Sequence, residues 1–200
     1  MGTHEVELSD VHSGPPPSRK RLLAPLRYLL IKHPEKTYYD FFVPGVWTLA
    51  LFAGYFFVDP KPALFGDSGI IKLTRDLLVM AVPFLVGALA AVAMGSPGQH
   101  LDRRLTGVPL YLDGQSLTLR QFVCYLLGYL CLIGLTTLIA TVGATVLHDA
   151  VAAWTNARPN LASAVVHAGA FALAGALSVL TVTVLWALYF LTAVVNQTGD

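Results

Sequence analysis

The residues most able to do chemistry in this chain are two histidines and an aspartate, His148, Asp149 and His167. Two imidazoles and one carboxylate form a ligand set that Zn²⁺ accepts. Their spacing matches no metal motif, however, and they fall at the ends of two apolar segments, where polar side chains commonly meet water. We therefore expect neither a metal nor any other cofactor.

Catalytic motifs are missing from the sequence. Cys124 and Cys131 would lie about 10 Å apart along one helix, too far for a disulfide, so we interpret both as small buried hydrophobic residues. Metalloprotease, nucleophile-elbow, P-loop and dinucleotide-binding motifs are absent. The central parts of the apolar segments also lack Asp, Glu, Lys, Arg and His, on which ion-coupled transport and intramembrane proteolysis depend. The chain is therefore predicted not to be an enzyme.

The composition is that of an integral membrane protein. Hydrophobic residues make up 55% of the chain and charged residues only 12%, and the mean hydropathy is +0.62. A soluble domain is about 25% charged, so this chain lacks the polar residues that a water-exposed surface needs. Residues 1–17 are polar and proline-rich, which predicts a disordered cytoplasmic tail. Because no apolar core follows at signal-peptide distance, we expect the tail to be retained.

The fold predicted from the apolar segments is all-α, an integral membrane bundle of four transmembrane helices. A span needs about 20 apolar residues, and within lipid only a helix satisfies its own backbone. The bundle is expected to occupy residues 37–200, with a cytoplasmic loop over 95–121 in which Asp113-Gly114 predicts a small hairpin. The predicted spans cover about 41–58, 77–94, 122–147 and 165–195.

Two start signals precede predicted helices. Asp67 and Ser68 stand where a side chain could cap a helix that begins ahead of the second span. Thr118 and Gln121 match the capping box, a Ser or Thr followed three residues later by Glu or Gln. This box predicts that the third helix begins just after Thr118.

Basic residues and leucines alternate over residues 18–36, ahead of the first span. On a helical wheel the leucines share one arc of roughly 120°, with most of the basic residues outside it, as in an amphipathic helix. We predict an interfacial N-terminal helix that is attracted by anionic lipid of the cytoplasmic leaflet. It serves either to fix the topology or to receive a partner. The candidate lipid- or partner-binding residues, some in the central loop, are Arg19, Lys20, Arg21, Arg27, Lys32, Arg103 and Arg104.

The distribution of positive charge predicts the orientation. Nine of the 13 Lys and Arg residues lie in the N-terminal stretch or in the loop 95–121. Because Lys and Arg concentrate in cytoplasmic loops, both regions are expected on the cytoplasmic side. We therefore predict a multi-pass protein of the bacterial cytoplasmic (inner) membrane with both termini in the cytoplasm.

Small and hydroxyl side chains recur at helical spacing on the third and fourth spans. Rows of small residues let helices approach closely, whereas threonines either bond across helices or bond their own backbone. These rows are predicted to serve helix packing or, alternatively, to line a polar path. Their members are Gly134, Thr137, Thr141 and Thr145 on the third span and Ala168, Ala172 and Ala176 on the fourth.

Three features also carry a family resemblance. A basic N-terminal stretch is followed by "LDRRLTG" in the central loop and by "LRQFVCYLLGYL" at the start of the third span. In this arrangement the chain resembles the small four-span membrane subunits of bacterial anti-phage operons, of which the Kiwa system's membrane subunit is one. The resemblance covers most of the chain and implies an oligomeric membrane sensor or scaffold that recruits a soluble cytosolic effector. It implies no catalytic residue.

The function predicted from the sequence is therefore that of a non-enzymatic membrane sensor or scaffold. We expect it not to bind nucleic acid directly. Its expected partners are anionic lipid, further copies of the chain and a soluble cytosolic protein. The alternative is a pore or small channel that permeabilises the membrane along the threonine row, because a pore that opens by wetting needs no charged residue in its spans.

Overall fold

The computed structural model describes residues 21–31, 36–60, 62–95, 111–112, 115–155 and 158–196. The predicted disordered tail over 1–17 and most of the predicted loop 95–121 lie outside these residues. The described chain is all-α, as predicted, and four of its helices are long and apolar enough to cross a membrane. It is therefore a multi-pass membrane protein. The candidate spans are Tyr38–Phe57, Ile70–Met94, Leu119–Thr155 and Asn160–Tyr189.

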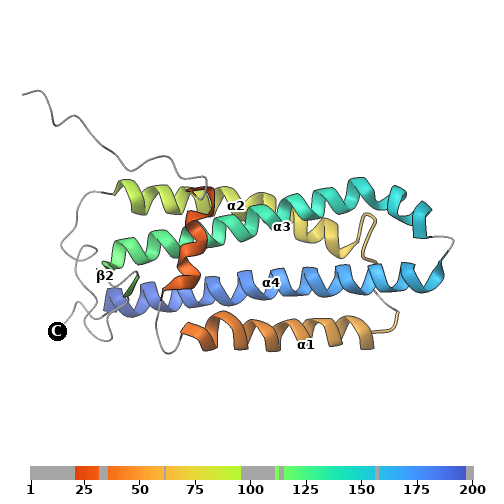
Figure 1. Ribbon diagram of the computed structural model, residues 1–200, viewed down its shortest axis with the longest axis horizontal. Helices are drawn as coiled ribbons and strands as arrows, with labels where there is room; N and C mark the ends of the chain where they lie inside the picture. The colour runs from red at the N-terminus through yellow and green to blue at the C-terminus, as the bar shows by residue number, and fades with distance from the viewer. Residues whose placement is uncertain are drawn as a thin grey trace, which may run out of the picture.

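The four long helices lie side by side in an open row. In Figure 1 their order is α2 (Ile70–Met94), α3 (Leu119–Thr155), α4 (Pro159–Asn196) and α1 (Val43–Phe57), and the neighbours in this order are the helices that pack together. Half of the apolar stretch of α3 is buried within the chain, against 6% of that of α2. The predicted bundle is thus a row with α1 and α2 at its edges, and α3 is its most buried helix.

Successive long helices run in opposite directions, so their connections gather at two ends of the row (Figure 1). The Tyr28 end holds the N-terminal segment, the start of α3 and the end of α4. The Thr155 end holds the connection from α3 to α4 and the turn between α1 and α2. The turn between α1 and α2 carries the chain from one edge of the row to the other, whereas the connection from α3 to α4 joins neighbouring helices.

Helices α3 and α4 are longer than the predicted spans. They contain 37 and 38 residues, or roughly 55 Å at the helical rise, against a hydrocarbon core of about 30 Å. The capping box that starts α3 is confirmed, because the Thr118 N–H donates to Gln121 Oε1 at 3.1 Å and the Gln121 N–H donates to Thr118 Oγ1 at 3.4 Å. The α3–α4 hairpin therefore either tilts strongly or extends past the hydrocarbon at the Thr155 end.

The cap predicted for α2 is wrong. The N-cap residue is Gly69, and no side chain caps the helix. Instead, the first two amides of α2 donate to carbonyls of the preceding turn, Ile70 N–H to Ala63 O at 3.0 Å and Ile71 N–H to Leu64 O at 3.1 Å. Carbonyl groups of the turn thus accept the hydrogen bonds that the side chain of Asp67 or Ser68 was expected to accept.

The predicted hairpin is present in the central loop. Strands β1 (Tyr111–Leu112) and β2 (Gln115–Ser116) pair antiparallel, with Tyr111 opposite Ser116. The paired residues flank the Asp113-Gly114 sequence from which the hairpin was predicted.

The N-terminal segment differs from the predicted amphipathic helix over 18–36. Its described part is a 3₁₀-helix, η1 (Arg21–Leu30), which crosses the row at the Tyr28 end (Figure 1). Pro25 lies inside it, and because proline has no N–H it interrupts the hydrogen bonds of an α-helix. The segment also packs against protein: Tyr28 and Ile31 are buried, whereas Leu30 stays 63% exposed.

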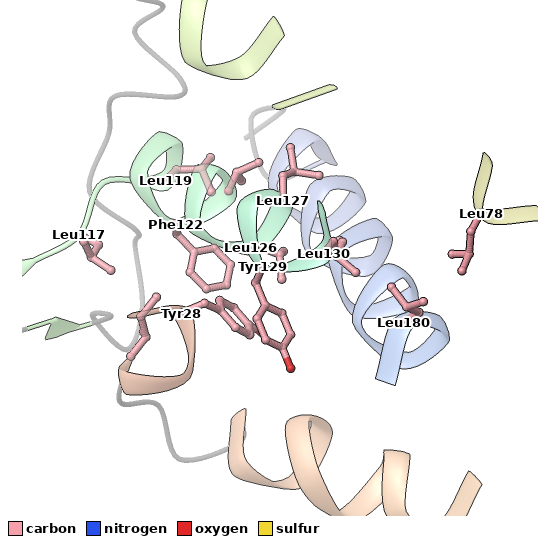
Figure 2. Close-up of a cluster of buried hydrophobic side chains, with 13 residues drawn as sticks. Tyr28, Leu78, Leu117, Leu119, Phe122, Leu126, Leu127, Tyr129, Leu130 and Leu180 are labelled. Atoms are coloured by element: carbon pink, nitrogen blue, oxygen red, sulfur yellow. The ribbon is translucent and has the colours of Figure 1, made fainter. Parts of the chain in front are cut away.

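The main hydrophobic core lies at the Tyr28 end and is built on the first turns of α3. Figure 2 shows Phe122, Leu126 and Leu130 of α3 gathered with Tyr28 of η1, and these four side chains are almost completely buried. This core positions the N-terminal segment.

We predict that Gly69→Ala disrupts the turn before α2. A Cβ atom at Gly69 would lie 2.7 Å from Leu64 O and 2.7 Å from the Phe65 carbonyl carbon, so the backbone must shift. The midpoint of thermal unfolding in detergent should fall. The matched control is Gly87→Ala, whose Cβ meets nothing within 4 Å and which should be neutral or stabilising by up to about 1 kcal/mol. Equal midpoints for the two variants would contradict the tight turn.

Candidate functional site at the Tyr28 end

A buried ion pair stands at the start of the first span. Lys36 Nζ lies 2.5 Å from Asp40 Oδ2, and the two side chains are only 6% and 7% exposed. The residues are one helical turn apart, at the junction of the N-terminal segment with the π-helix η2 (Tyr38–Phe42) that leads into α1. Taking two charges out of water is costly unless each finds a close partner. Each charge in this pair therefore depends on the other.

Tyr28 completes the polar cluster from the neighbouring segment. Its hydroxyl donates to Asp40 Oδ1 at 3.1 Å, and its ring lies under Lys36 Nζ, 4.1 Å from the centroid. Burial, and secondarily the Asp40 carboxylate, raise the pKa of the Tyr28 phenol well above its usual range. The phenol therefore stays protonated and keeps donating its hydrogen bond to the carboxylate.

Aromatic stacking fastens this cluster to the long helices. The Tyr28 ring lies 5.0 Å from that of Tyr129 and 6.2 Å from that of Phe122, both on α3 (Figure 2). On the other side, the ring of Tyr39 stacks on Trp186 of α4 at 4.7 Å. Such pairs add about 0.5–1.5 kcal/mol beyond area burial. The N-terminal segment and η2 are thus bound to both central helices.

Arg120 links α3 to the end of α2. Its Nη1 donates to the carbonyl oxygen of Gly95 at 3.0 Å, and Gly95 is the C-cap residue of α2. A cation at a helix C-terminus satisfies a free carbonyl and complements the helix dipole. Arg120, which sequence reasoning treated only as a loop charge, therefore stabilises helix packing at the Tyr28 end.

Only one of the predicted basic binding residues has a described side chain. Arg27 lies exposed on η1. Arg21 begins η1. The other candidates fall outside the described residues, namely Arg19, Lys20, Lys32, Arg103 and Arg104. The described part of the predicted basic surface is therefore the outer side of η1.

The row predicted on α3 meets α2 at Gly134, where a Cβ atom would lie 3.1 Å from Val82 Cγ2. Gly134, Thr137 and Thr141 are buried, whereas Thr145 is exposed. Each threonine hydroxyl donates to a carbonyl of its own helix: Thr137 to Ile133 and Thr141 to Leu138, both at 2.8 Å, and Thr145 to Thr141 at 2.9 Å. Because these hydroxyls are already bonded within α3, the row acts as a close-packing face in the single chain.

The alanine row predicted on α4 lies beside the face that packs. Ala168 and Ala172 are exposed and Ala176 is half-buried. The buried small residues are instead Ala170, Ala174 and Ser178. Several rows of small residues run along this helix at the same spacing, so the sequence alone could not tell which one meets a neighbouring helix.

The candidate metal ligands and cysteines form no site within the described residues. No group of three or more His, Cys, Asp and Glu could hold a metal ion in that part of the chain. His148 Nδ1 lies 2.9 Å from Asp149 Oδ1, and His167 Nδ1 lies 2.7 Å from Ser163 O. Cys124 and Cys131 are free and half-buried.

Sequence reasoning missed the ion pair at the Tyr28 end. Lys36 was counted only as one of several basic residues, and Asp40 was not considered. The available signal was their spacing, because oppositely charged residues four apart share one face of a helix. What the spacing could not indicate is the burial, which comes from Tyr28 on a different segment.

Comparison of the chain with protein-family models, with curated proteins and with solved structures finds no match in any of the three.

We predict that Asp40→Asn strongly destabilises the Tyr28 end, because it leaves the Lys36 ammonium buried without its counter-charge. Breaking a buried pair by removing one partner costs about 3–5 kcal/mol. Unfolding in detergent, followed through tryptophan fluorescence, should shift accordingly. The double variant Lys36→Met with Asp40→Leu removes both charges and should be milder than Asp40→Asn alone. A double variant at least as unstable would contradict the dependence of each charge on the other.

We also predict that Gly134→Leu separates α2 from α3. Even a Cβ atom at Gly134 would lie 3.1 Å from Val82 Cγ2, so a larger side chain cannot fit without moving α2. Overpacking typically costs about 1–3 kcal/mol. Gly143→Leu on the same helix is the matched control, since its Cβ meets nothing within 4 Å. Disulfide trapping between cysteines placed on α2 and α3 should fail only for the Gly134 variant.

Proposed function

We propose that this protein is a non-enzymatic, oligomeric sensor or scaffold of the bacterial inner membrane that recruits a soluble cytosolic partner. The observation that carries the proposal is the fixed position of the N-terminal segment. η1 is held across the Tyr28 end by a fully buried tyrosine and by the Lys36–Asp40 pair beneath it. A segment held in this way would present Arg27 at a defined place, whereas a topology signal needs only net charge.

We further propose that the central loop is a second component of the docking surface. The hairpin of β1 and β2 and the capped start of α3 are also at the Tyr28 end, and they follow the loop that contains Arg103 and Arg104. A partner with an acidic surface would meet the outer side of η1 and this loop together. Charge complementarity of this kind favours fast and selective association. The proposal places the Tyr28 end in the cytoplasm, in keeping with the distribution of Lys and Arg.

Oligomerisation is proposed from the open row. α1 and α2 are edge helices with little of their apolar surface buried inside the chain. Exposed small residues such as Ala168 and Ala172 on α4 would allow the close approach of another copy. A role in anti-phage defence is proposed only from the resemblance of the sequence to membrane subunits of anti-phage operons.

The competing function is a pore between copies of the chain. The bonds of Thr137 and Thr141 within their own helix support packing, because a polar lining works through hydroxyls that face the path. The pore nevertheless makes a different prediction from the scaffold, and one pair of variants separates the two.

We predict that Arg103→Glu with Arg104→Glu abolishes partner binding, whereas Thr137→Val with Thr141→Val leaves it intact. Like charges across an interface cost several kcal/mol, whereas the valine changes remove only hydroxyls that bond their own helix. The measurement is co-purification from mild detergent with mass spectrometry, expressed as partner per copy of the chain. Arg158→Glu is the matched control, since Arg158 is an exposed basic residue at the Thr155 end.

Two outcomes would contradict the scaffold. Equal loss of partner in the Arg158 variant would mean that overall charge, rather than the cytoplasmic surface, holds the partner. Dye release from vesicles that contain the protein, present in the unmodified chain and absent in the valine variant, would establish the pore instead.

A further inference from the structure

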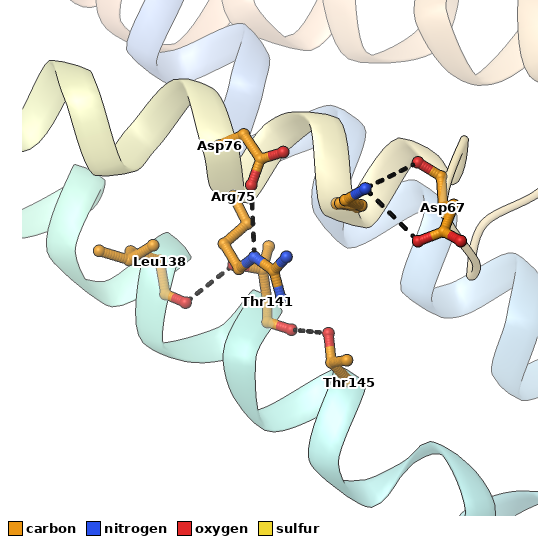
Figure 3. A network of polar contacts seen from close by, with 7 residues as sticks. Asp67, Arg75, Asp76, Leu138, Thr141 and Thr145 are labelled. Carbon is orange, nitrogen blue, oxygen red and sulfur yellow. Dashed lines mark hydrogen bonds and ion pairs between the residues drawn. The ribbon is translucent and has the colours of Figure 1, made fainter.

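A cavity opens at the Thr155 end, far from the surface proposed for the partner. It has a volume of about 250 Å³ and lies where the turn before α2 meets the first turns of α2 and the side of α3. Figure 3 shows Arg75 extending from α2 toward α3, with Asp67 on the adjoining turn. The lining residues are Phe65, Gly66, Asp67, Lys72, Arg75 and Thr145.

The wall formed by the turn is held in place by backbone and ring contacts. Gly66 has a φ of +101°, in the left-handed region that favours glycine, and its carbonyl accepts the Gly69 N–H at 3.1 Å. The ring of Phe65 lies 4.2 Å from that of His148 on α3. The cavity is therefore formed before any ligand arrives, which lowers the cost of binding.

The cavity offers donors for a phosphate. Lys72 and Arg75 are one turn apart on the same side of α2, and both line it. Arg75 Nε lies 3.6 Å from Asp76 Oδ1, and within the described part of the chain its two terminal amino groups have no partner. A guanidinium with both amino groups available binds phosphate oxygens in a bidentate manner, and an ammonium one turn away adds a second charge.

The cavity also offers a place for a positive group. Asp67 contacts Lys72 Nζ through its carbonyl oxygen at 3.2 Å and its carboxylate at 3.5 Å, and its side chain remains fully exposed. The carboxylate can accept hydrogen bonds from a second ammonium, and the face of the Phe65 ring attracts a cation. A purely anionic ligand would be repelled by Asp67, whereas a zwitterion uses both signs.

The position along α2 indicates where the ligand would come from. Arg75 lies about 8 Å along the helix from its first residue, by the helical rise, and the long apolar stretch of α2 begins at Leu77, just after Asp76. Charged side chains so near the end of a span are expected at the level of the lipid headgroups. The ligand that is most concentrated at that depth is the membrane lipid itself.

We propose that this cavity binds the headgroup of a phospholipid that carries a phosphate and a primary ammonium. The phosphate lies between Lys72 and Arg75, and the ammonium lies on the carboxylate of Asp67 beside Phe65. The site is at the opposite end of the row from the proposed partner surface, so it stands whether or not the proposed function does.

Native mass spectrometry of the full chain in detergent tests this site. Dioleoyl phosphatidylethanolamine and dioleoyl phosphatidylglycerol are titrated separately, and dissociation constants are read from the bound fractions. The ethanolamine lipid should bind more tightly. Arg75→Gln and Lys72→Gln should each weaken its binding about tenfold, the loss expected for one charge-assisted hydrogen bond, while Lys72→Arg retains it. Arg158→Gln removes the same charge outside the cavity and should change nothing.

Asp67→Asn distinguishes a zwitterion site from a simple anion site. It should weaken the ethanolamine lipid and strengthen the glycerol lipid, so that the order of affinities reverses. Tighter binding of both lipids by this variant, or glycerol lipid preferred by the unmodified chain, overturns the proposal. So does equal weakening in the Arg75 and Arg158 variants. Water-soluble glycerophosphoethanolamine should compete only weakly, because it lacks acyl chains. If it binds as tightly as the lipid, the site takes a soluble ligand and the lipid assignment fails.

Discussion

The arrangement of the Tyr28 end depends on the burial of one ion pair, Lys36 with Asp40. Two charges that are only 6% and 7% exposed are stable there because each is the partner of the other and because Tyr28 supplies both a hydrogen bond and an aromatic face. Tyr28 in turn is buried by α3. A segment that would otherwise be an independent amphipathic helix is therefore part of the folded protein, and it gives the first span a defined starting point.

The membrane constrains the rest of the molecule differently. In lipid the apolar surface of a helix gains no hydrophobic free energy by meeting another helix. Close packing and shape therefore decide which helices associate. Gly134 approaches Val82 of α2 closely, and the buried Thr137 and Thr141 lie on the same side of α3. Because their hydroxyls bond within α3, this contact needs no hydrogen bond across helices. The result is a row with two edges that remain open to lipid or to another copy.

The charged side chains at the two ends of the row differ in burial. At the Tyr28 end the charges of Lys36 and Asp40 neutralise each other out of contact with water, and Arg27 is exposed on η1. At the Thr155 end Asp67, Lys72 and Arg75 are half-buried or exposed around a cavity. The first arrangement holds structure together, whereas the second leaves charged groups able to bind something else.

The number and approximate position of the spans, the capping box before α3 and the hairpin in the central loop were all determined by the sequence, because they depend on local composition and on residues a few positions apart. The cap of α2, the face of α4 that packs and the burial of Lys36 and Asp40 were decided only by the tertiary structure. Each depends on a group outside the residues that form the pattern: the Ala63 carbonyl, the neighbouring helices α1 and α3, and Tyr28. Periodicity identifies the faces of a helix, but only packing selects which of them is covered.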